Sequence, residues 1–131
     1  MNSLQIFPVL IATIVAFLCG AIWYSPMLFG KTRVQALNFA SKAATRHTFI
    51  TYLLAFVLFF IAASVFSLFL GIDVPLSAAV FDGFITGICW VATSFGINYL
   101  FIGRSIKLFL IDAGFHTLQF TLYGVVFGLW Q

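Results

Sequence analysis

Long apolar runs separated by short polar stretches cover most of this 131-residue chain. About 20 apolar residues cross the hydrocarbon core of a bilayer as a helix, and four of the runs reach that length. The predicted spans are residues 6–24, 47–70, 77–102 and 107–130. The pattern therefore predicts an all-α membrane protein, with a single four-helix transmembrane domain over residues 1–131.

Turn residues mark the ends of these runs. Gly71 begins a tight turn between the second and third spans, and Gly103 begins the turn between the third and fourth. After the first span, Ser25 and Pro26 are typical of a helix start, and the segment that follows, up to Arg46, is polar and basic. We expect this segment to lie at the membrane surface as an interfacial helix or a partly helical loop.

Basic residues are concentrated in two of the three connections. The first connection carries Lys31, Arg33, Lys42 and Arg46. The third carries Arg104 and Lys107, whereas the second contains Asp73 and no basic residue. By the positive-inside rule, the first and third connections are cytoplasmic and both termini lie outside. The basic first loop is expected to contact lipid head groups or a cytoplasmic partner.

Composition supports the membrane assignment and argues against several function classes. Hydrophobic residues make up 63% of the chain and charged residues 7%, and the mean hydropathy is +1.17, far outside the range of soluble domains. The net charge of +3 comes from loop residues, so nucleic-acid binding is not indicated. Cys19 and Cys89 lie in apolar runs without metal-type spacing, and we interpret them as small buried hydrophobes.

Polar residues recur at helical spacing within the third and fourth spans, so each set falls on one face of its helix. The third-span set is Asp82, Thr86, Trp90, Ser94 and Asn98, and the fourth-span set is Asp112, His116, Gln119 and Tyr123. If the two helices form an antiparallel hairpin, Asp82 lies near the depth of Tyr123, and Ser94 near that of Asp112. We therefore expect the two polar faces to meet and to form the candidate site.

Asp112 and His116 are one helical turn apart, so the carboxylate can accept a hydrogen bond from the imidazole and raise its basicity. Titratable groups inside a span are typical of proton relays. A structural alternative stays open, because Asp112 also lies close enough to Lys107 or Arg104 to pair with one of them.

Asp82 has no basic residue near its end of any span. A charge at such a depth costs at least ~2.5 kcal/mol, so the carboxyl group should be neutral, hydrogen-bonded or in contact with water. Tyr123, Gln119 and Thr86 are the expected hydrogen-bond partners.

No cofactor, metal or enzymatic site is predicted. His47 lies at the edge of its span and His116 about nine residues inside, so they differ in depth by roughly 13 Å and do not suit an axial haem pair. Neither zinc-type spacing nor a nucleophile–base–acid arrangement is present.

Two small-residue patches bear on assembly. Gly83 and Gly87 form a G-x-x-x-G pattern in the third span, and Gly124 and Gly128 form another in the fourth. Such patterns allow helices to approach closely. With four short helices, they favour a homodimer or a larger homo-oligomer.

The stretch at residues 20–31, Gly-Ala-Ile-Trp-Tyr-Ser-Pro-Met-Leu-Phe-Gly-Lys, resembles the small four-span membrane proteins known as domain of unknown function 1761. Residues 111–116 and the glycine-rich helix ending at Trp130 are also similar to that family. The family carries no assigned activity. The resemblance implies the four-span topology and, with the chain size, a bacterial inner membrane. It points to Asp112 and to an interfacial corner formed by Trp23, Tyr24, Ser25 and Pro26.

Two functions of different class remain. The first is a structural, accessory or binding membrane protein whose polar residues hold its helices together. The alternative is a small transporter or channel with a proton or cation route along Asp82, Asp112 and His116. The sequence identifies no substrate for either.

Overall fold

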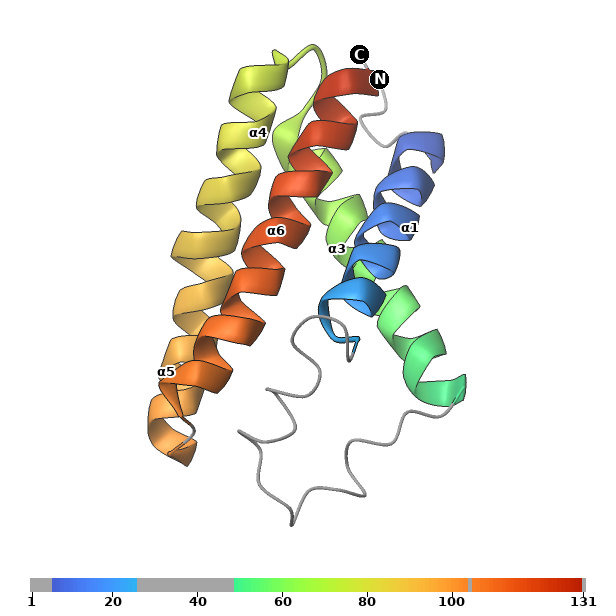
Figure 1. The fold of residues 1–131 in the computed structure, drawn as a ribbon. Coiled ribbons are helices and arrows are strands. Elements are labelled where there is room, and N and C mark those ends of the chain that lie inside the picture. The colour runs from blue at the N-terminus through green and yellow to red at the C-terminus, as the bar shows by residue number, and fades with distance from the viewer. Residues whose placement is uncertain (1–5, 26–48, 104, 131) are drawn as a thin grey trace.

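The computed structural model describes residues 6–25, 49–103 and 105–130, and every regular element within them is helical (Figure 1). The described residues form four long helical stretches, which we call passes for their path along the bundle, and the third is built from three consecutive segments. The elements are α1 (Ile6–Trp23), α3 (Phe49–Leu70), α4 (Leu76–Ile85), the π-helix η3 (Thr86–Val91), α5 (Ala92–Ile102) and α6 (Ile106–Trp130). Their described ends agree with the predicted spans to within one or two residues. The predicted basic interfacial segment, with Lys31, Arg33, Lys42 and Arg46, lies outside the described residues.

The passes run alternately in opposite directions (Figure 1). The start of α1, the end of α6 and the α3–α4 turn lie at one end of the molecule, and the turn between α5 and α6 lies at the other. Gly71 and Gly103 close their helices with φ of 87° and 73°, a backbone conformation that glycine adopts without steric cost. Both predicted turns are thereby confirmed.

Three helices are long and apolar enough to cross a membrane: Ile6–Trp23, Phe49–Leu70 and Leu76–Ile102. The predicted fourth span is not supported. Although α6 has 25 residues, it contains Lys107, Asp112, His116 and Gln119, which reduce its hydropathy. The outward surfaces of the bundle carry many large apolar side chains, as expected of helices that face lipid.

The core lies where α1, α3 and α6 meet. Its buried residues are Val9, Ala12, Ala16, Ala63, Phe66, Tyr123 and Phe127. The ring of Phe66 contacts the rings of Phe120 and Tyr123, with centroids 5.7 Å and 6.3 Å apart. Small residues on α1 and large aromatic residues on α3 and α6 therefore fill this space together.

The most extensive helix interface joins α4 to α6, and glycines make it close. A Cβ atom placed on Gly83 would lie 2.1 Å from the carbonyl oxygen of Phe120, and one on Gly124 would lie 2.2 Å from that of Ala79. Gly87 likewise faces the backbone of Thr117. The two glycine patterns thus pack against each other within one chain, so they give no support to the predicted homo-oligomer.

The two cysteines differ from the expectation of burial. Cys19 is half-buried, and Cys89 is exposed on the outward side of η3. A thiol is apolar enough to face lipid, which explains why an apolar run did not imply an interior position.

Candidate functional site

The π-helical turn η3 determines which residues of the third pass meet α6. Before this turn, Gly83 and Gly87 lie against the backbone of α6, four residues apart. After it, the next buried residue is Ala92, five residues beyond Gly87, and the contacts with α6 come from Phe95 and Tyr99. A π turn adds one residue to the helix and so rotates everything beyond it by about 100°.

The predicted polar face of the third pass does not meet α6. Asp82 comes before η3 and already lies beside this interface, since its neighbour Gly83 is the residue that contacts α6. The rotation accounts for the residues beyond the turn, Ser94 and Asn98. Asp82, Ser94 and Asn98 are exposed, and Trp90 is 60% exposed. The Ser94 hydroxyl donates to the carbonyl oxygen of Trp90, at 2.8 Å, instead of to α6. The hairpin register itself is close to the prediction, because Gly83 lies beside Phe120 of α6. Ser94 and Asn98 were placed on the wrong face because a strict four-residue repeat was carried through a π turn, whereas Asp82 was misplaced because the glycines next to the polar residues form the contact with α6.

Asp112 is 3% exposed, and its carboxylate accepts hydrogen bonds from two tyrosines. The hydroxyl of Tyr24, after the end of α1, donates to Oδ1 at 2.7 Å, and that of Tyr99, on α5, donates to Oδ2. Beside them, Trp23 Nε1 donates to the carbonyl oxygen of Ile111 at 3.1 Å. One carboxylate on α6 thereby fastens both α1 and α5, and we call this group the Asp112 clamp.

Sequence reasoning identified Asp112, Trp23 and Tyr24 but did not connect them, and it missed Tyr99. The spacing of 88 residues between Tyr24 and Asp112 carries no local signal. Ser25 completes the corner by donating its hydroxyl to the carbonyl oxygen of Ile22 at 2.7 Å, so it closes α1. The helix start predicted at Pro26 lies outside the described residues.

The other predicted residues of α6 form a continuous chain of hydrogen bonds. His116 Nδ1 lies 2.6 Å from Gln119 Oε1, Gln119 Nε2 donates to the Tyr123 hydroxyl at 2.8 Å, and that hydroxyl donates to the carbonyl oxygen of Phe59 on α3 at 3.0 Å. This pairing replaces the predicted hydrogen bond between His116 and Asp112. We call it the His116 chain.

The carbonyl group of Phe59, at the end of the His116 chain, determines which group donates in each of its hydrogen bonds. The carbonyl of Phe59 can only accept, so Tyr123 donates to it and accepts from the amide nitrogen of Gln119. The Gln119 oxygen then faces His116, whose Nδ1 must carry a hydrogen. Nε2 of the neutral ring is therefore an acceptor, and the ring lines two spaces beside α3, of about 270 Å³ and 380 Å³. Phe95 stacks on this ring at 4.9 Å and holds its plane.

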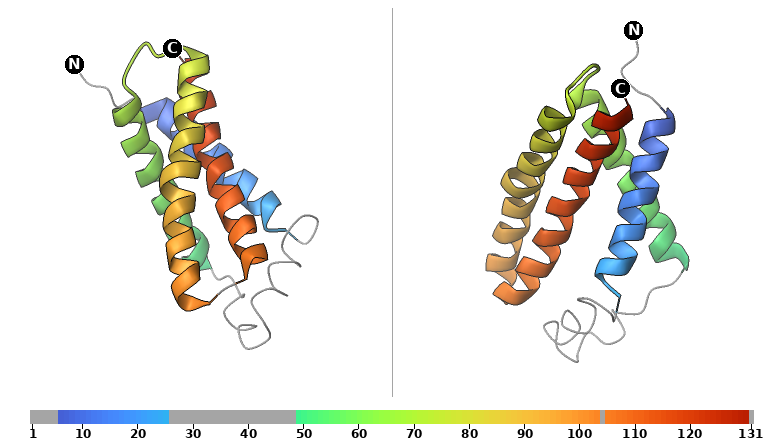
Figure 2. Two further views of the ribbon diagram at one scale, coloured as in Figure 1. Left: turned by 90° about the vertical axis from the view of Figure 1, so that its left-hand side faces the viewer. Right: turned by 45° about the horizontal axis from the view of Figure 1, so that its top comes forward.

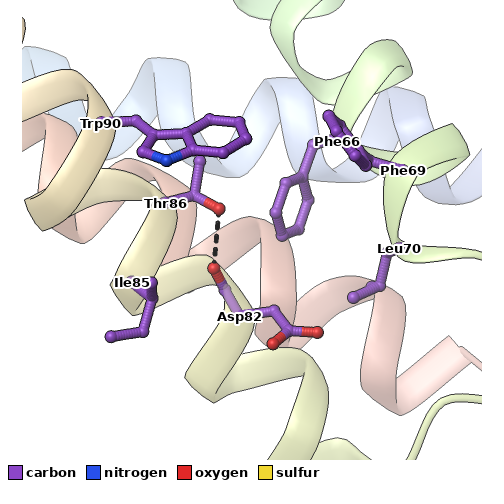
Figure 3. Close-up of a pocket in the computed structure, with 7 residues that line it drawn as sticks. All are labelled: Phe66, Phe69, Leu70, Asp82, Ile85, Thr86 and Trp90. Carbon is purple, nitrogen blue, oxygen red and sulfur yellow. Dashed lines mark hydrogen bonds between the residues drawn. The ribbon is translucent and has the colours of Figure 1, made fainter.

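Asp82 belongs to a different environment. With Thr86 and Trp90 it faces the last turns of α3 across a groove of about 220 Å³ (Figure 3). The groove is lined by Phe66, Phe69, Leu70, Asp82, Ile85, Thr86 and Trp90. Thr86 donates its hydroxyl to the backbone carbonyl of Asp82 at 2.8 Å, and the expected partners Gln119 and Tyr123 bond each other. Within the described residues, no side chain donates a hydrogen bond to the Asp82 carboxylate.

Across the described helices, no group of three or more His, Cys, Asp and Glu side chains is close enough to hold a metal ion. Asp82 and the Asp112 clamp lie on different sides of the third pass, since Asp82 faces α3 and Tyr99 faces α6.

Comparison with known families matches residues 7–128 to the family described as Protein of unknown function (DUF1761). The chain belongs to this family. No curated protein and no solved structure matches it. The two stretches on which the DUF1761 resemblance rests are joined in the fold, because Trp23 and Tyr24 of the first bond Ile111 and Asp112 of the second.

Proposed function

We propose that this DUF1761 protein is a four-span membrane protein with a structural, accessory or binding role rather than an enzyme. In this proposal it lies in a bacterial inner membrane, with both termini outside and membrane lipids as its surroundings. Three apolar helices support the membrane location. The fourth span would be α6, whose 25 residues extend for about 37 Å and thus exceed a hydrocarbon core of ~30 Å.

The position of α6 in the bundle supports its inclusion. It runs antiparallel to α4, η3 and α5 along their length (Figures 1 and 2) and also packs on α1. Asp112, Gln119 and Tyr123 are all buried. Two of the polar residues that reduce the hydropathy of α6, Asp112 and Gln119, therefore face other helices and not lipid, and Lys107 lies in the first turn at the helix end. Buried and hydrogen-bonded polar groups lower the cost of placing α6 in a membrane.

Labelling of single cysteines tests this topology. In a Cys19→Ala, Cys89→Ala background, Asp73→Cys, Ser105→Cys and Leu129→Cys are treated with a membrane-impermeant maleimide in intact spheroplasts. We expect labelling at 73 and 129, and protection at 105 until the membrane is permeabilised. If the cysteines at positions 105 and 129 were labelled to the same extent in intact spheroplasts, α6 would not span the membrane.

The structural role rests on one observation: the polar side chains of α6 bond one another or neighbouring helices. The Asp112 clamp joins α1 and α5 to α6, and the His116 chain joins α6 to α3. Hydrogen bonds of this kind stabilise helix association inside a bilayer, by about 0.6 kcal/mol each on average. A proton route along Asp82, Asp112 and His116 is less well supported, because Asp82 faces α3 on another side.

Proton flux distinguishes the two roles. Purified protein is placed in liposomes with a trapped pH dye under an imposed potential, as wild type and as Asp112→Asn. We expect both to match protein-free liposomes, and Asp112→Asn to melt at a lower temperature. Flux in the wild type that disappears in a folded Asp112→Asn variant would support the transport alternative instead.

Homo-oligomerisation is also part of the proposal. Only Ala63, Phe66 and Ser67 of α3 are buried, so most of this 22-residue helix has no covering element within the described parts of one chain. Cross-linking through Leu58→Cys, on its exposed side, should give dimers in membranes. Cross-linking through Leu100→Cys, exposed on α5, is the matched control and should give fewer.

A further inference from the structure

We propose that the groove around Asp82 binds a lipophilic organic cation, an ammonium or phosphonium group with apolar substituents. The groove lies between the end of α3 and the segment from Asp82 to Trp90 (Figure 3). The inference deepens the binding role proposed above and rests on the membrane position of α3 and α4. It does not depend on whether α6 spans.

Charge is the first argument. Asp82 lies six residues beyond the start of α4, about 9 Å along an apolar helix. It is exposed, and no described side chain donates to its carboxylate. The one Lys or Arg in the described part of the chain, Lys107, lies in the first turn of α6 at the other end of the bundle. No basic side chain of the described residues lies near this carboxylate, so a cation bound in the groove would stabilise it.

The walls determine which kind of cation fits. Phe66 and Phe69 lie across from Asp82 and Thr86 in Figure 3, and Trp90 completes the aromatic lining. The rings of Phe69 and Trp90 meet edge to face, with centroids 5.9 Å apart, and the indole remains largely exposed. Aromatic faces attract quaternary cations, and tryptophan does so most strongly. A carboxylate and three aromatic rings that line one groove therefore favour an organic cation.

A bare metal ion and a large ligand are both poorer occupants. Metal ions such as Ca²⁺ require six or more oxygen ligands, whereas Asp82 is the only acidic residue among the described residues that line the groove. The volume of about 220 Å³ is below the ~300 Å³ at which pockets for drug-sized molecules begin. The occupant is thus a cationic group with one or two apolar substituents. Because Asp82 lies below the start of α4, we assign the groove to a free cation and not to a lipid head group.

The test uses benzyltrimethylammonium as the probe, with the purified full chain in a non-ionic detergent and equilibrium dialysis as the assay. We expect saturable binding with one site per chain. Asp82→Asn should weaken it at least tenfold, Trp90→Leu severalfold, and Asp82→Glu less than threefold because it keeps the charge. Asp73→Asn is the matched control, since it removes the carboxylate of the neighbouring turn, and should leave binding within twofold.

Three results would overturn the inference. They are an absence of saturable binding by folded wild type, equal loss in Asp73→Asn and Asp82→Asn, and unchanged binding in Asp82→Asn. Displacement of the probe by added phosphatidylcholine would instead assign the groove to a lipid head group and contradict the free cation. Folding is checked by helical circular dichroism and gel filtration. Failure of binding with a correct cysteine-labelling pattern would reject this inference alone and leave the proposed topology standing.

Discussion

Asp112 and Asp82 are both aspartates inside apolar helices, yet their surroundings are opposite. The Asp112 carboxylate is buried and accepts from Tyr24 and Tyr99, whereas the Asp82 carboxylate is exposed beside an aromatic groove. The difference arises because α6 has neighbours on several sides, while among the described residues the outward face of α4 has only the end of α3 beside it. A carboxylate within an apolar helix can therefore hold helices together or remain available to a ligand. Only its position in the bundle distinguishes the two.

The largest effect should come from deleting Cys89 in η3. Removal of one residue would convert the π turn to an α turn and rotate α5 by about 100°. Tyr99 would leave Asp112 and Phe95 would leave His116, at a cost of more than ~3 kcal/mol in the free energy of unfolding. Cys89→Ala, which keeps the chain length at an exposed site, should change it by less than ~0.5 kcal/mol. If the Cys89 deletion and Cys89→Ala were equally stable, the π turn would not determine which face of α5 packs on α6.

Gly83→Ala should be the next most damaging change. Its Cβ atom would lie 2.1 Å from the carbonyl oxygen of Phe120, so α4 and α6 would have to separate, at about 1–3 kcal/mol. Gly96→Ala is the control, because its Cβ atom would meet only the side chain of Phe109, at 3.3 Å. Unfolding in mixed detergent measures both. A loss at position 96 as large as at position 83 would argue against a close contact between the two backbones.

Tyr123→Phe should have an intermediate effect. It removes the hydroxyl that links Gln119 to Phe59 and leaves the buried Gln119 amide without its acceptor, at about 1 kcal/mol. Thr93→Val is a matched loss of one hydroxyl that bonds only its own helix, at an exposed site, and should cost less. If the two variants were equally stable, the His116 chain would not contribute to holding α3.

The helical passes and their turns could be predicted from the sequence. Uninterrupted apolar runs determine the helices, and Gly71 and Gly103 determine where two of them end, since local chemistry decides both. The relative alignment of the third and fourth passes could also be predicted, because the short turn between them leaves little freedom to shift one helix along the other. The predicted fourth span, α6, is not supported, since its interior polar residues reduce its hydropathy.

The site was predicted only in part. Asp112 and Tyr123 do bond neighbouring helices, and His116 and Gln119 are linked to Tyr123 by hydrogen bonds within α6. Their partners could not be predicted. Tyr24 and Phe59 come from distant parts of the chain, and Tyr99 lies beyond the π turn, for which the residue pattern gives no signal. For the same reason Ser94 and Asn98 were placed on the wrong face.

The smallest effect is expected at these two residues. Ser94→Ala and Asn98→Ala remove exposed polar groups outside the interface with α6, so each should change the free energy of unfolding by less than ~0.5 kcal/mol. A loss above ~1 kcal/mol for either one would restore the original hypothesis of a polar face directed at α6.

The most direct test of the account compares Asp112→Ala with Asp82→Ala in the free energy of unfolding in mixed detergent. Asp112→Ala leaves two tyrosine hydroxyls without their acceptor and should lose about 2–3 kcal/mol. Asp82→Ala removes an exposed carboxylate with no described donor and should be unchanged or slightly more stable. Equal losses, or a larger loss at Asp82, would contradict the division into an internal clamp and an open binding groove.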